Sequence, residues 1–410
     1  MIHIEAIEPR RHFSAVSLDA SFGTAGVVPL RDGIAAKSGR NATTPTSMVV
    51  DHAGRVIVVT TSEDTSSTDG SYPFPTSVMT RLLPDGRPDP RFAVATGGSV
   101  DLDVSGPQVV VDSQNRIYVL GGDVTRYTAS GKIDRTYADH GTTNFIRLAG
   151  DEDVLATDIT IGPGDGVWAF LQFSTEMSSS AAIVRLTADG KELGYVSGVP
   201  YAPVTPGDVY YHATGTGPLR TLADGSVMAI GHVHLGIYPT RKNSGDGGSE
   251  DGVTVLKFTP GGKPDRTYGT RGQVFYREVP GYGYGYGANI TSVGIADDGT
   301  VLLRNETGSG KIRNLLITPT GRSGGLKTVG PRILDGQILV QPDGRRLVLD
   351  TVAKTLRRYK ADGAIDSAFN DGLPVSGVDT MAFGPAGTLL IADTGRDATD
   401  TRYAVRRIDL

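Results

Sequence analysis

The sequence predicts an all-β protein, a seven-bladed β-propeller of four-stranded antiparallel blades closed by pairing of the N- and C-terminal strands. Two different sequence signals each recur seven times at nearly the same spacing, and the two ends of the chain complement each other. The 410 residues include 55 Gly and 23 Pro beside many Val, Thr and Tyr, a composition typical of short strands joined by tight turns. No stretch carries a long amphipathic helical pattern.

The first signal is an apolar pair, a turn and an apolar run, as in "VVDHAGRVIVV" and "VGIADDGTVLL". Asp-Gly and Asn-type pairs adopt positive φ at little cost, which a tight turn between antiparallel strands requires. The mean spacing is about 56 residues. The predicted turn residues, in chain order, are Gly54, Asn115, Gly166, Gly225, Gly299, Gly344 and Gly387.

The second signal is a polar-Gly turn followed by an acid and then, in most copies, an aromatic residue, as in "KFTPGGKPDRTYGTRG" at 257–272. It recurs about every 58 residues and predicts a second hairpin per unit. The acids in chain order are Asp19, Asp89, Asp134, Glu192, Asp265 and Asp366, with a degenerate copy at 318–325 between the last two.

Two hairpins give four strands per unit. The second strand of the first hairpin is continuously apolar, as in "RVIVV", which indicates a sheet covered on both faces. Four-stranded sheets stacked face to face at this repeat length indicate a propeller. An open array of hairpins is the alternative.

The chain ends predict closure of the ring. "RYAVRRIDL" at 402–410 matches a third strand without its fourth, and "LDASFGTAGVV" at 18–28 is a fourth strand without its third. Joining them completes one blade and leaves no exposed sheet edge at the seam. We therefore expect one propeller domain at 17–410, preceded by an N-terminal arm at 1–16.

These residues carry a family resemblance. "LDASFGTAGV", "RTYGTRGQV" and "DSAFNDG" resemble the delta-60 repeat (L-x-x-DG-x-x-D-x-x-FG-x-x-G) of bacterial exported and surface proteins. The resemblance covers roughly residues 17 to 410 and is poor at 185–198 and 313–330, where the Phe-Gly element is missing. It implies a propeller fold and an extracellular location, and it implies no reaction.

A second resemblance lies in "EPRRHFS", within residues 4–17, which is similar to the LEPR-XLL motif near the start of large exported bacterial proteins. It departs from the motif at Ile7 and at His12-Phe13. No apolar h-region follows Met1, so no conventional signal peptide is visible. The resemblance implies a secreted or cell-surface protein, and an ordinary basic arm is the alternative.

Composition excludes several functions. The net charge of −5 argues against nucleic acid as a partner. The absence of cysteine excludes disulfides, thiol catalysis and cysteine metal sites. The longest apolar runs are about four residues, far below the roughly 20 that span a bilayer, so we expect no membrane insertion. We also expect a monomer.

Long non-repeating inserts fall at 60–77, 198–214, 236–252 and 276–290, all on the disc face opposite the repeated turns. They contain nine of the 16 tyrosines, several times an even share. Exposed tyrosines suit sugars or protein partners, and packing of their rings on the blade rim is the alternative. The predicted ligand-binding residues are Tyr72, Tyr210, Tyr211, Tyr238, Tyr282, Tyr284 and Tyr286.

Metal and enzyme signals are sparse. In "NSGDGGSEDG", Asp246, Glu250 and Asp251 are candidate oxygen ligands for Ca²⁺, although the segment lacks the spacing of known calcium loops and also suits a solvated loop. No other cofactor is expected. His232 and His234 share one face of a strand, a spacing that metal sites use, but no third histidine stands at a matching position in another blade.

No sequence motif of a known catalytic class occurs, so no catalytic residue is assigned. The sequence favours a non-catalytic extracellular or cell-surface binding or structural propeller, whose ligand is a glycan or a surface protein held on the insert-bearing face. The alternative is a hydrolase or lyase with a site at the mouth of the central channel.

Overall fold

The structure is a computed structural model. It describes residues 17–30, 43–62, 76–145, 153–174, 179–196, 209–214, 218–237, 248–277, 289–306, 312–321, 338–341, 343–350, 355–362, 364–369, 373–374, 378–393 and 404–410. The elements in these ranges are strands and short 3₁₀ turns. Within them, no helix is long and apolar enough to cross a bilayer.

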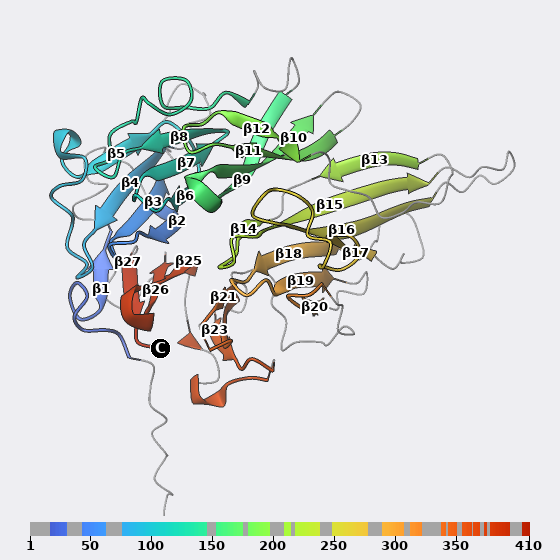
Figure 1. Ribbon diagram of the computed structural model, residues 1–410. Helices are drawn as coiled ribbons and strands as arrows, with labels where there is room; N and C mark the ends of the chain where they lie inside the picture. Colours follow the sequence, from blue (N-terminus) through green and yellow to red (C-terminus); the bar gives the residue numbers. More distant parts are fainter. Residues whose placement is uncertain are drawn as a thin grey trace, which may run out of the picture.

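The strands form seven antiparallel sheets arranged in a ring, which confirms the predicted seven-bladed propeller (Figure 1). Blade 1 consists of β2 (Thr43–Val50), β3 (Val56–Ser62), β4 (Thr76–Leu82) and β5 (Ser99–Leu102). Blade 2 consists of β6 (Gln108–Val111), β7 (Ile117–Gly121) and β8 (Asp123–Tyr127). Blade 3 consists of β9 (Asp153–Ile161), β10 (Val167–Ser174), β11 (Ser179–Leu186) and β12 (Glu192–Val196).

The second half of the chain follows the same plan. Blade 4 consists of β13 (Val209–Thr214), β14 (Leu219–Thr221), β15 (Val227–Ile237), β16 (Gly248–Phe258) and β17 (Gln273–Arg277). Blade 5 consists of β18 (Asn289–Ile295), β19 (Val301–Glu306) and β20 (Ile312–Ile317). Blade 6 consists of β21 (Ile338–Val340), β22 (Arg346–Asp350), β23 (Thr355–Tyr359) and β24 (Leu373–Pro374). Blade 7 consists of β25 (Val378–Phe383), β26 (Leu389–Asp393), β27 (Ala404–Ile408) and β1 (Val27–Pro29).

The described part of the chain shows four strands in most blades and three in blades 2 and 5. In blade 2, the residues after the second hairpin still approach the outer strand, because Thr143 N donates to Val124 O at 3.0 Å and Arg126 N donates to Gly141 O at 2.9 Å. These bonds are too few to form a regular ladder. The fourth position of this blade is therefore an irregular segment rather than a strand.

The first hairpins confirm the turn chemistry in six blades. Gly54 and Asn115 adopt φ of +74° and +60°, and the predicted glycines of blades 4 to 7 also have positive φ. Blade 3 differs, because Gly166 is extended at φ −71° and Gly164 and Asp165 take positive φ instead. The 3₁₀ turn η3 (Pro163–Asp165) moves the bend two residues toward the N-terminus.

The second signal encodes a clamp on the third strand of a blade. In blade 1, Arg81 Nη2 lies 2.9 Å from Asp89 Oδ2, and its guanidinium stacks on Phe92 at 4.6 Å from the ring centre. Such stacking adds cation–π attraction to the ion pair. The basic, acidic and aromatic members recur in other blades as Arg126–Asp134–Tyr137, Lys257–Asp265–Tyr268, Arg358–Asp366–Phe369 and Arg407–Asp19–Phe22.

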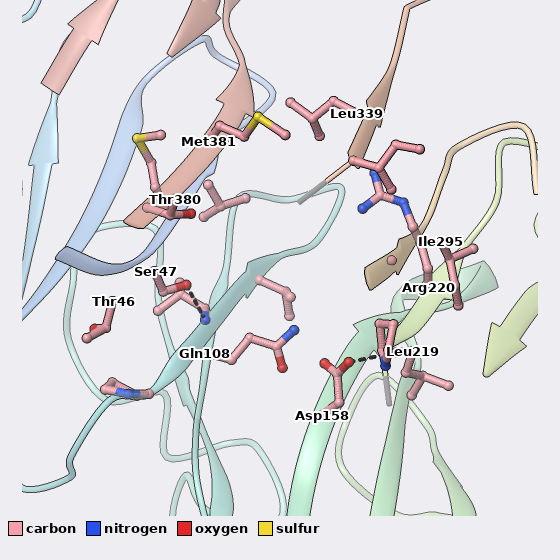
Figure 2. Close-up of a pocket in the computed structure, with 18 of the residues that line it drawn as sticks. Thr46, Ser47, Gln108, Asp158, Leu219, Arg220, Ile295, Leu339, Thr380 and Met381 are labelled. Atoms are coloured by element: carbon pink, nitrogen blue, oxygen red, sulfur yellow. Dashed lines mark hydrogen bonds between the residues drawn. The ribbon is translucent and has the colours of Figure 1, made fainter. Parts of the chain in front are cut away.

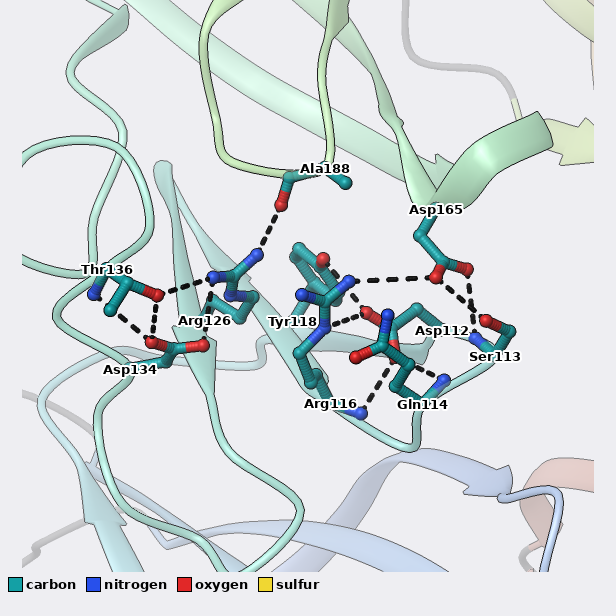
Figure 3. Close-up of polar contacts among 10 residues, drawn as sticks. All are labelled: Asp112, Ser113, Gln114, Arg116, Tyr118, Arg126, Asp134, Thr136, Asp165 and Ala188. Carbon is teal, nitrogen blue, oxygen red and sulfur yellow. Dashed lines mark hydrogen bonds and ion pairs between the residues drawn. The ribbon is translucent and has the colours of Figure 1, made fainter.

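The clamp also joins neighbouring blades. Arg126 Nη1 donates to Ala188 O in the second-hairpin turn of blade 3 (Figure 3). The residue after the clamp aromatic reaches the same turn, since Ala138 N donates to Asp189 O at 2.9 Å. Arg185 makes the equivalent bond to Gly261 O of blade 4 at 2.7 Å. The second sequence signal therefore specifies contacts between neighbouring blades as well as a turn within one blade.

The seam of the ring confirms terminal closure. Strand β1 pairs antiparallel with β27, with Val28 opposite Val405, and Leu18 forms an isolated bridge with Ile408. Both strands lie in the blade that contains β25 and β26 (Figure 1). One blade is thus built from both ends of the chain, as the sequence predicts.

The hydrophobic core lies between the faces of adjacent blades. Phe22 and Leu30 pack with Val56 of blade 1 and with Leu390 and Val405 of blade 7 in one buried cluster. Another cluster joins blades 2 and 3. Because both faces of most blades are covered, their central strands are apolar throughout.

Blade 4 carries an extension. Strands β15 and β16 are each 11 residues long, and β13 pairs with the far half of β15 (Figure 1). We call residues 209–214, 232–237 and 248–252 the wing. The segment 248–252 is part of a strand, so half of the stretch interpreted as a solvated loop at 243–252 is paired.

Candidate functional site

The central channel of the ring is a cavity of about 440 Å³ lined from all seven blades. That volume lies within the usual range for small-molecule sites. Nearly all of its lining residues belong to the first strand of each blade. They are Thr46, Ser47, Met48, Val49, Gly106, Pro107, Gln108, Val109, Val110, Asp158, Pro218, Leu219, Arg220, Gly294, Ile295, Ile338, Leu339, Thr380 and Met381.

One position of the first strand supplies polar groups to the channel on four consecutive blades. This position lies four residues before the residue that closes the first hairpin of the blade. The polar residues that it supplies to the channel are Thr380, Ser47, Gln108 and Asp158 (Figure 2). Around the ring these side chains come from blades 7, 1, 2 and 3 in order. The same position is Pro218 in blade 4 and Ser292 in blade 5, and in blade 6 it is Gln337, which lies outside the described residues.

Local strand irregularities accompany this series. The pairing of β2 with β3 shifts between Pro45 and Ser47, and the pairing of β9 with β10 shifts beside Asp158. A shift of this kind marks a β-bulge, which inserts one residue and changes the direction of the neighbouring side chains. In β2 the extra residue is Thr46, which is exposed and lines the channel.

Three of the polar side chains tie one blade to the next. Ser47 Oγ accepts a hydrogen bond from Val109 N at 3.1 Å. Gln108 Oε1 accepts from Ile159 N at 2.9 Å, and its Nε2 donates to Ile159 O at 3.2 Å. Asp158 Oδ2 accepts from Leu219 N at 2.6 Å (Figure 2). Each tie satisfies a backbone N–H of an inner strand that faces the channel.

Asp158 is the titratable carboxyl of the channel. Burial raises its pKa to about 7, although the bond from Leu219 N, the contact with Gln108, the bond from Ile159 N and the charge of Arg220 all act to lower it. Desolvation disfavours the charged carboxylate more than these donors favour it. A carboxyl that titrates near neutrality in a cavity is a candidate functional group.

The described lining from blades 5 and 6 is aliphatic and tightly built. Ile295, Ile338 and Leu339 come from blades 5 and 6. Gly294 is closely approached, because a Cβ at this position would lie 2.9 Å from Ile338 Cγ2. The described channel lining therefore presents hydroxyl, amide and carboxyl groups from four blades and aliphatic groups from blades 5 and 6.

Arg220 connects the channel to a second cavity. Its side chain lines the channel, and its Nε donates to Asp297 Oδ1 at 2.8 Å (Figure 2 shows Arg220). Asp297 lines a cavity of about 520 Å³ among the first-hairpin turns of blades 4 to 7, together with Asp298 and Gln341. The arginine charge is thus paired where the two cavities adjoin.

Away from the channel, polar contacts tie neighbouring turns. Asp165 of blade 3 accepts from Ser113 N at 3.0 Å and from Ser113 Oγ at 2.7 Å, and it lies 3.6 Å from Arg116 Nη2 (Figure 3). Asp112, with a fully buried side chain, pairs with Arg116 and accepts from Tyr118 Oη at 3.1 Å. Burial raises the pKa of Tyr118 to about 12, so these groups are structural.

The predicted tyrosines are placed only in part. Tyr210 and Tyr211 stand in β13, opposite Gly236 and Leu235 of β15. The other candidates lie outside the described residues and are Tyr72, Tyr238, Tyr282, Tyr284 and Tyr286.

The predicted metal ligands are divided in the same way. Asp246 lies outside the described residues. Glu250 and Asp251 are adjacent residues of β16, opposite Leu235 and His234, so they occupy opposite faces of the sheet. Among residues whose side chains the structure describes, no three His, Asp or Glu residues are grouped to hold a metal ion.

The described lining of the channel contains Asp158 and Arg220 as its titratable groups, and no His, Cys, Lys or Tyr. Hydrolysis and elimination normally use a pair of positioned acid and base groups or a nucleophile beside a base. The arrangement is suited to holding a small group with several hydrogen-bonding atoms and one apolar face.

Comparisons with known proteins find distant structural similarities only. No family model matches the chain, and no curated protein matches it. Among solved structures, a streptogramin B lyase is 14% identical, covering 93% of this chain and 97% of its own, with a TM-score of 0.43. The polysaccharide lyase Uly1 is 10% identical, covering 93% and 94%, with a TM-score of 0.46.

A third similar structure is the calcium-binding protein regucalcin from Agrobacterium tumefaciens. It is 11% identical, with coverage of 94% of this chain and 95% of its own and a TM-score of 0.38. These identities and scores carry no information on the reaction or ligand of this chain.

Sequence reasoning missed the channel residues. Counted back from the first-hairpin turns, this position is Pro218 in blade 4 and polar in the other six copies, where it is Ser47, Gln108, Asp158, Ser292, Gln337 and Thr380. The available signal was a polar residue four positions before the turn in "SMVVD", "QVVVD", "DITIG" and "TMAFG". It emerges once the hairpins are aligned on their turns.

Proposed function

We propose that this chain is a non-catalytic, extracellular or cell-surface binding propeller. Its ligand is a glycan or a surface protein that approaches the insert-bearing face and places a terminal group in the central channel. The observation that carries the proposal is the described channel lining, which combines hydroxyl, amide and carboxyl groups from four blades with aliphatic side chains from blades 5 and 6. Sugar rings have this same division between hydroxyl edges and apolar faces.

The inserts give the proposal its second support. Antiparallel topology puts the links β3–β4, β12–β13, β15–β16 and β17–β18 at the ends of the blades opposite the first-hairpin turns. The tyrosine-rich inserts coincide with these links. A ligand held at the channel mouth would therefore have aromatic residues within reach on the same face.

A glycan array with purified protein tests this function. We expect binding to a restricted set of glycans. The variant Thr46→Phe fills the channel from an exposed bulge residue, and it should weaken binding at least 10-fold. Thr320→Phe, at an exposed turn position on the opposite face, is the matched control. A Tyr282/Tyr284/Tyr286 triple alanine variant measures the contribution of the insert at 276–290 to glycan binding, separately from that of the channel. Binding that Thr46→Phe leaves unchanged would remove the channel from the proposal.

The second candidate is a hydrolase or lyase at the same channel, and Asp158 is the observation in its favour. A carboxyl with a pKa of about 7 is suited to general acid or base catalysis at neutral pH. Incubation of the protein with each glycan that it binds, followed by mass spectrometry, separates the two functions. Cleavage that Asp158→Asn abolishes would replace binding by catalysis as the function.

A further inference from the structure

The wing brings three histidines and a carboxylate to one face of a three-stranded sheet. In the register of β13, β15 and β16, His212 lies opposite His234, and His234 lies opposite Asp251. His232, two residues earlier in the central strand, lies opposite Thr214 and Val253. Alternate residues of a strand share a face, so His212, His232, His234 and Asp251 belong to the same face.

The spacing of these positions suits a metal ion. Directly opposed residues of an antiparallel pair have Cβ atoms about 5 Å apart, and residues i and i+2 of one strand are about 7 Å apart. His234 is therefore next to each of the other three. Imidazole and carboxylate groups at such distances are a common ligand set for Zn²⁺.

The same face is apolar where it enters the blade. Ile230 and Val255 lie opposite each other, and both belong to the buried cluster between blades 4 and 5. Val253, opposite His232, is the last buried residue of the series. The histidine and aspartate positions follow directly after this buried row along β15 and β16.

The composition of the wing is also unusual. The chain has seven histidines, and three of them stand in the wing. A solvated sheet face has no need to collect histidines. Their concentration opposite one another is what a metal site requires.

We propose that His212, His232, His234 and Asp251 form a site for a divalent transition metal ion, with Zn²⁺ as the best-matched ion. Three imidazoles and one carboxylate complete a tetrahedral shell and leave no open position, which is the form of a structural site. The ion would join β13 to the β15–β16 hairpin and hold the wing together. This inference is independent of the proposed ligand binding.

Zn²⁺ titration in competition with a chromophoric chelator tests the site, using untagged protein stripped of metal. We expect one high-affinity Zn²⁺ per chain. His234→Ala should weaken binding at least 100-fold and His212→Ala at least 10-fold. His140→Ala, which removes an exposed histidine beside Asp139 on another blade, is the control and should leave affinity unchanged. Equal affinities for all four proteins would overturn the proposal.

A second pair of variants tests the register itself. Asp251→Asn should weaken Zn²⁺ binding, whereas Glu250→Gln changes the neighbouring carboxylate on the other face and should not. The reverse result would mean that the ligands differ from those assigned. Stripped protein should be cut by protease within the wing, and Zn²⁺ should protect it. Far-UV circular dichroism and urea unfolding check that each variant retains the folded propeller.

Discussion

Removal of one arginine at the seam measures how much terminal closure stabilises the ring. Arg407 Nε and Nη2 each lie 2.7 Å from Asp19 Oδ2, and Nη2 also donates to Ser21 Oγ at 2.7 Å. Its guanidinium stacks on Phe22 at 4.8 Å and donates from Nη1 to Pro84 O of blade 1. The change Arg407→Ala therefore removes contacts to the N-terminal segment and to the next blade together.

The expected loss in the free energy of unfolding is about 3.5–4 kcal/mol. Breaking a buried ion pair by deleting one partner costs roughly 3–5 kcal/mol, because the other charge is left unpaired. Asp19 retains 19% of its side-chain exposure and keeps its bonds from Ser21 N and Oγ, which places the cost at the lower end. Loss of the stacking adds about 0.5–1 kcal/mol.

Urea unfolding of three variants tests whether the contacts of Arg407 at the seam stabilise the closed ring. Arg81→Ala deletes the corresponding clamp inside blade 1 and should cost at least as much as Arg407→Ala, because Asp89 is more deeply buried than Asp19. Arg87→Ala breaks an exposed pair with Asp85 and should change the free energy of unfolding by less than about 0.5 kcal/mol. If Arg407→Ala behaved like Arg87→Ala while Arg81→Ala destabilised, the reasoning about closure would be refuted.

Three further predictions concern the channel, the clamp turn and the seam strand. Burial holds the pKa of Asp158 near 7, so the folded chain binds a proton that the unfolded chain releases near pH 4. Stability should fall as pH rises from about 4 to about 7. Asp158→Asn should remove that slope and gain roughly 1–4 kcal/mol relative to wild type at pH 8, and urea unfolding at pH 5 and 8 checks this. Gly269→Ala should cost at least about 2 kcal/mol, because φ is +51° and a Cβ at this position would lie 2.2 Å from the backbone oxygen of Gln273. Gly269→Val should cost more still in the same assay, and a smaller cost than that of Gly269→Ala would contradict the steric argument. Deletion of residues 404–410 removes β27 and should abolish cooperative thermal unfolding in calorimetry, whereas an unchanged transition would contradict closure.

The fold was predictable because its determinants repeat. The turn glycines and the Arg–Asp–aromatic clamp occur in most blades, so each copy supports the others. Blade 3 shows the limit of this reasoning. There Glu192 replaces the clamp aspartate, Arg185 stacks instead on Trp168 at 4.9 Å, and the bend moves to Gly164. A degenerate copy keeps its place in the ring but changes its local contacts.

The channel was not predictable in the same way, because its residues act through strand register and not through repetition. Asp158 approaches Leu219 N across a distance of 61 residues in the sequence. In the wing, His212 precedes His234 by 22 positions, and only the pairing of β13 with β15 puts them opposite each other. A search for metal ligands within a single strand finds only His232 and His234.

The channel residues can both tie blades together and bind a ligand. Ser47 Oγ acts as an acceptor toward Val109 N, so that tie does not use its O–H as a donor. Asp158 accepts from Leu219 N on Oδ2 and from Ile159 N on Oδ1, and a carboxylate offers about four acceptor positions. Gln108 uses one of its two amide hydrogens toward Ile159 O. A ligand with hydroxyl groups would therefore add bonds to these side chains without breaking the ties. Binding should then stabilise the folded ring, and a glycan bound in the channel should raise its Tm by an amount that grows with the logarithm of the glycan concentration divided by Kd.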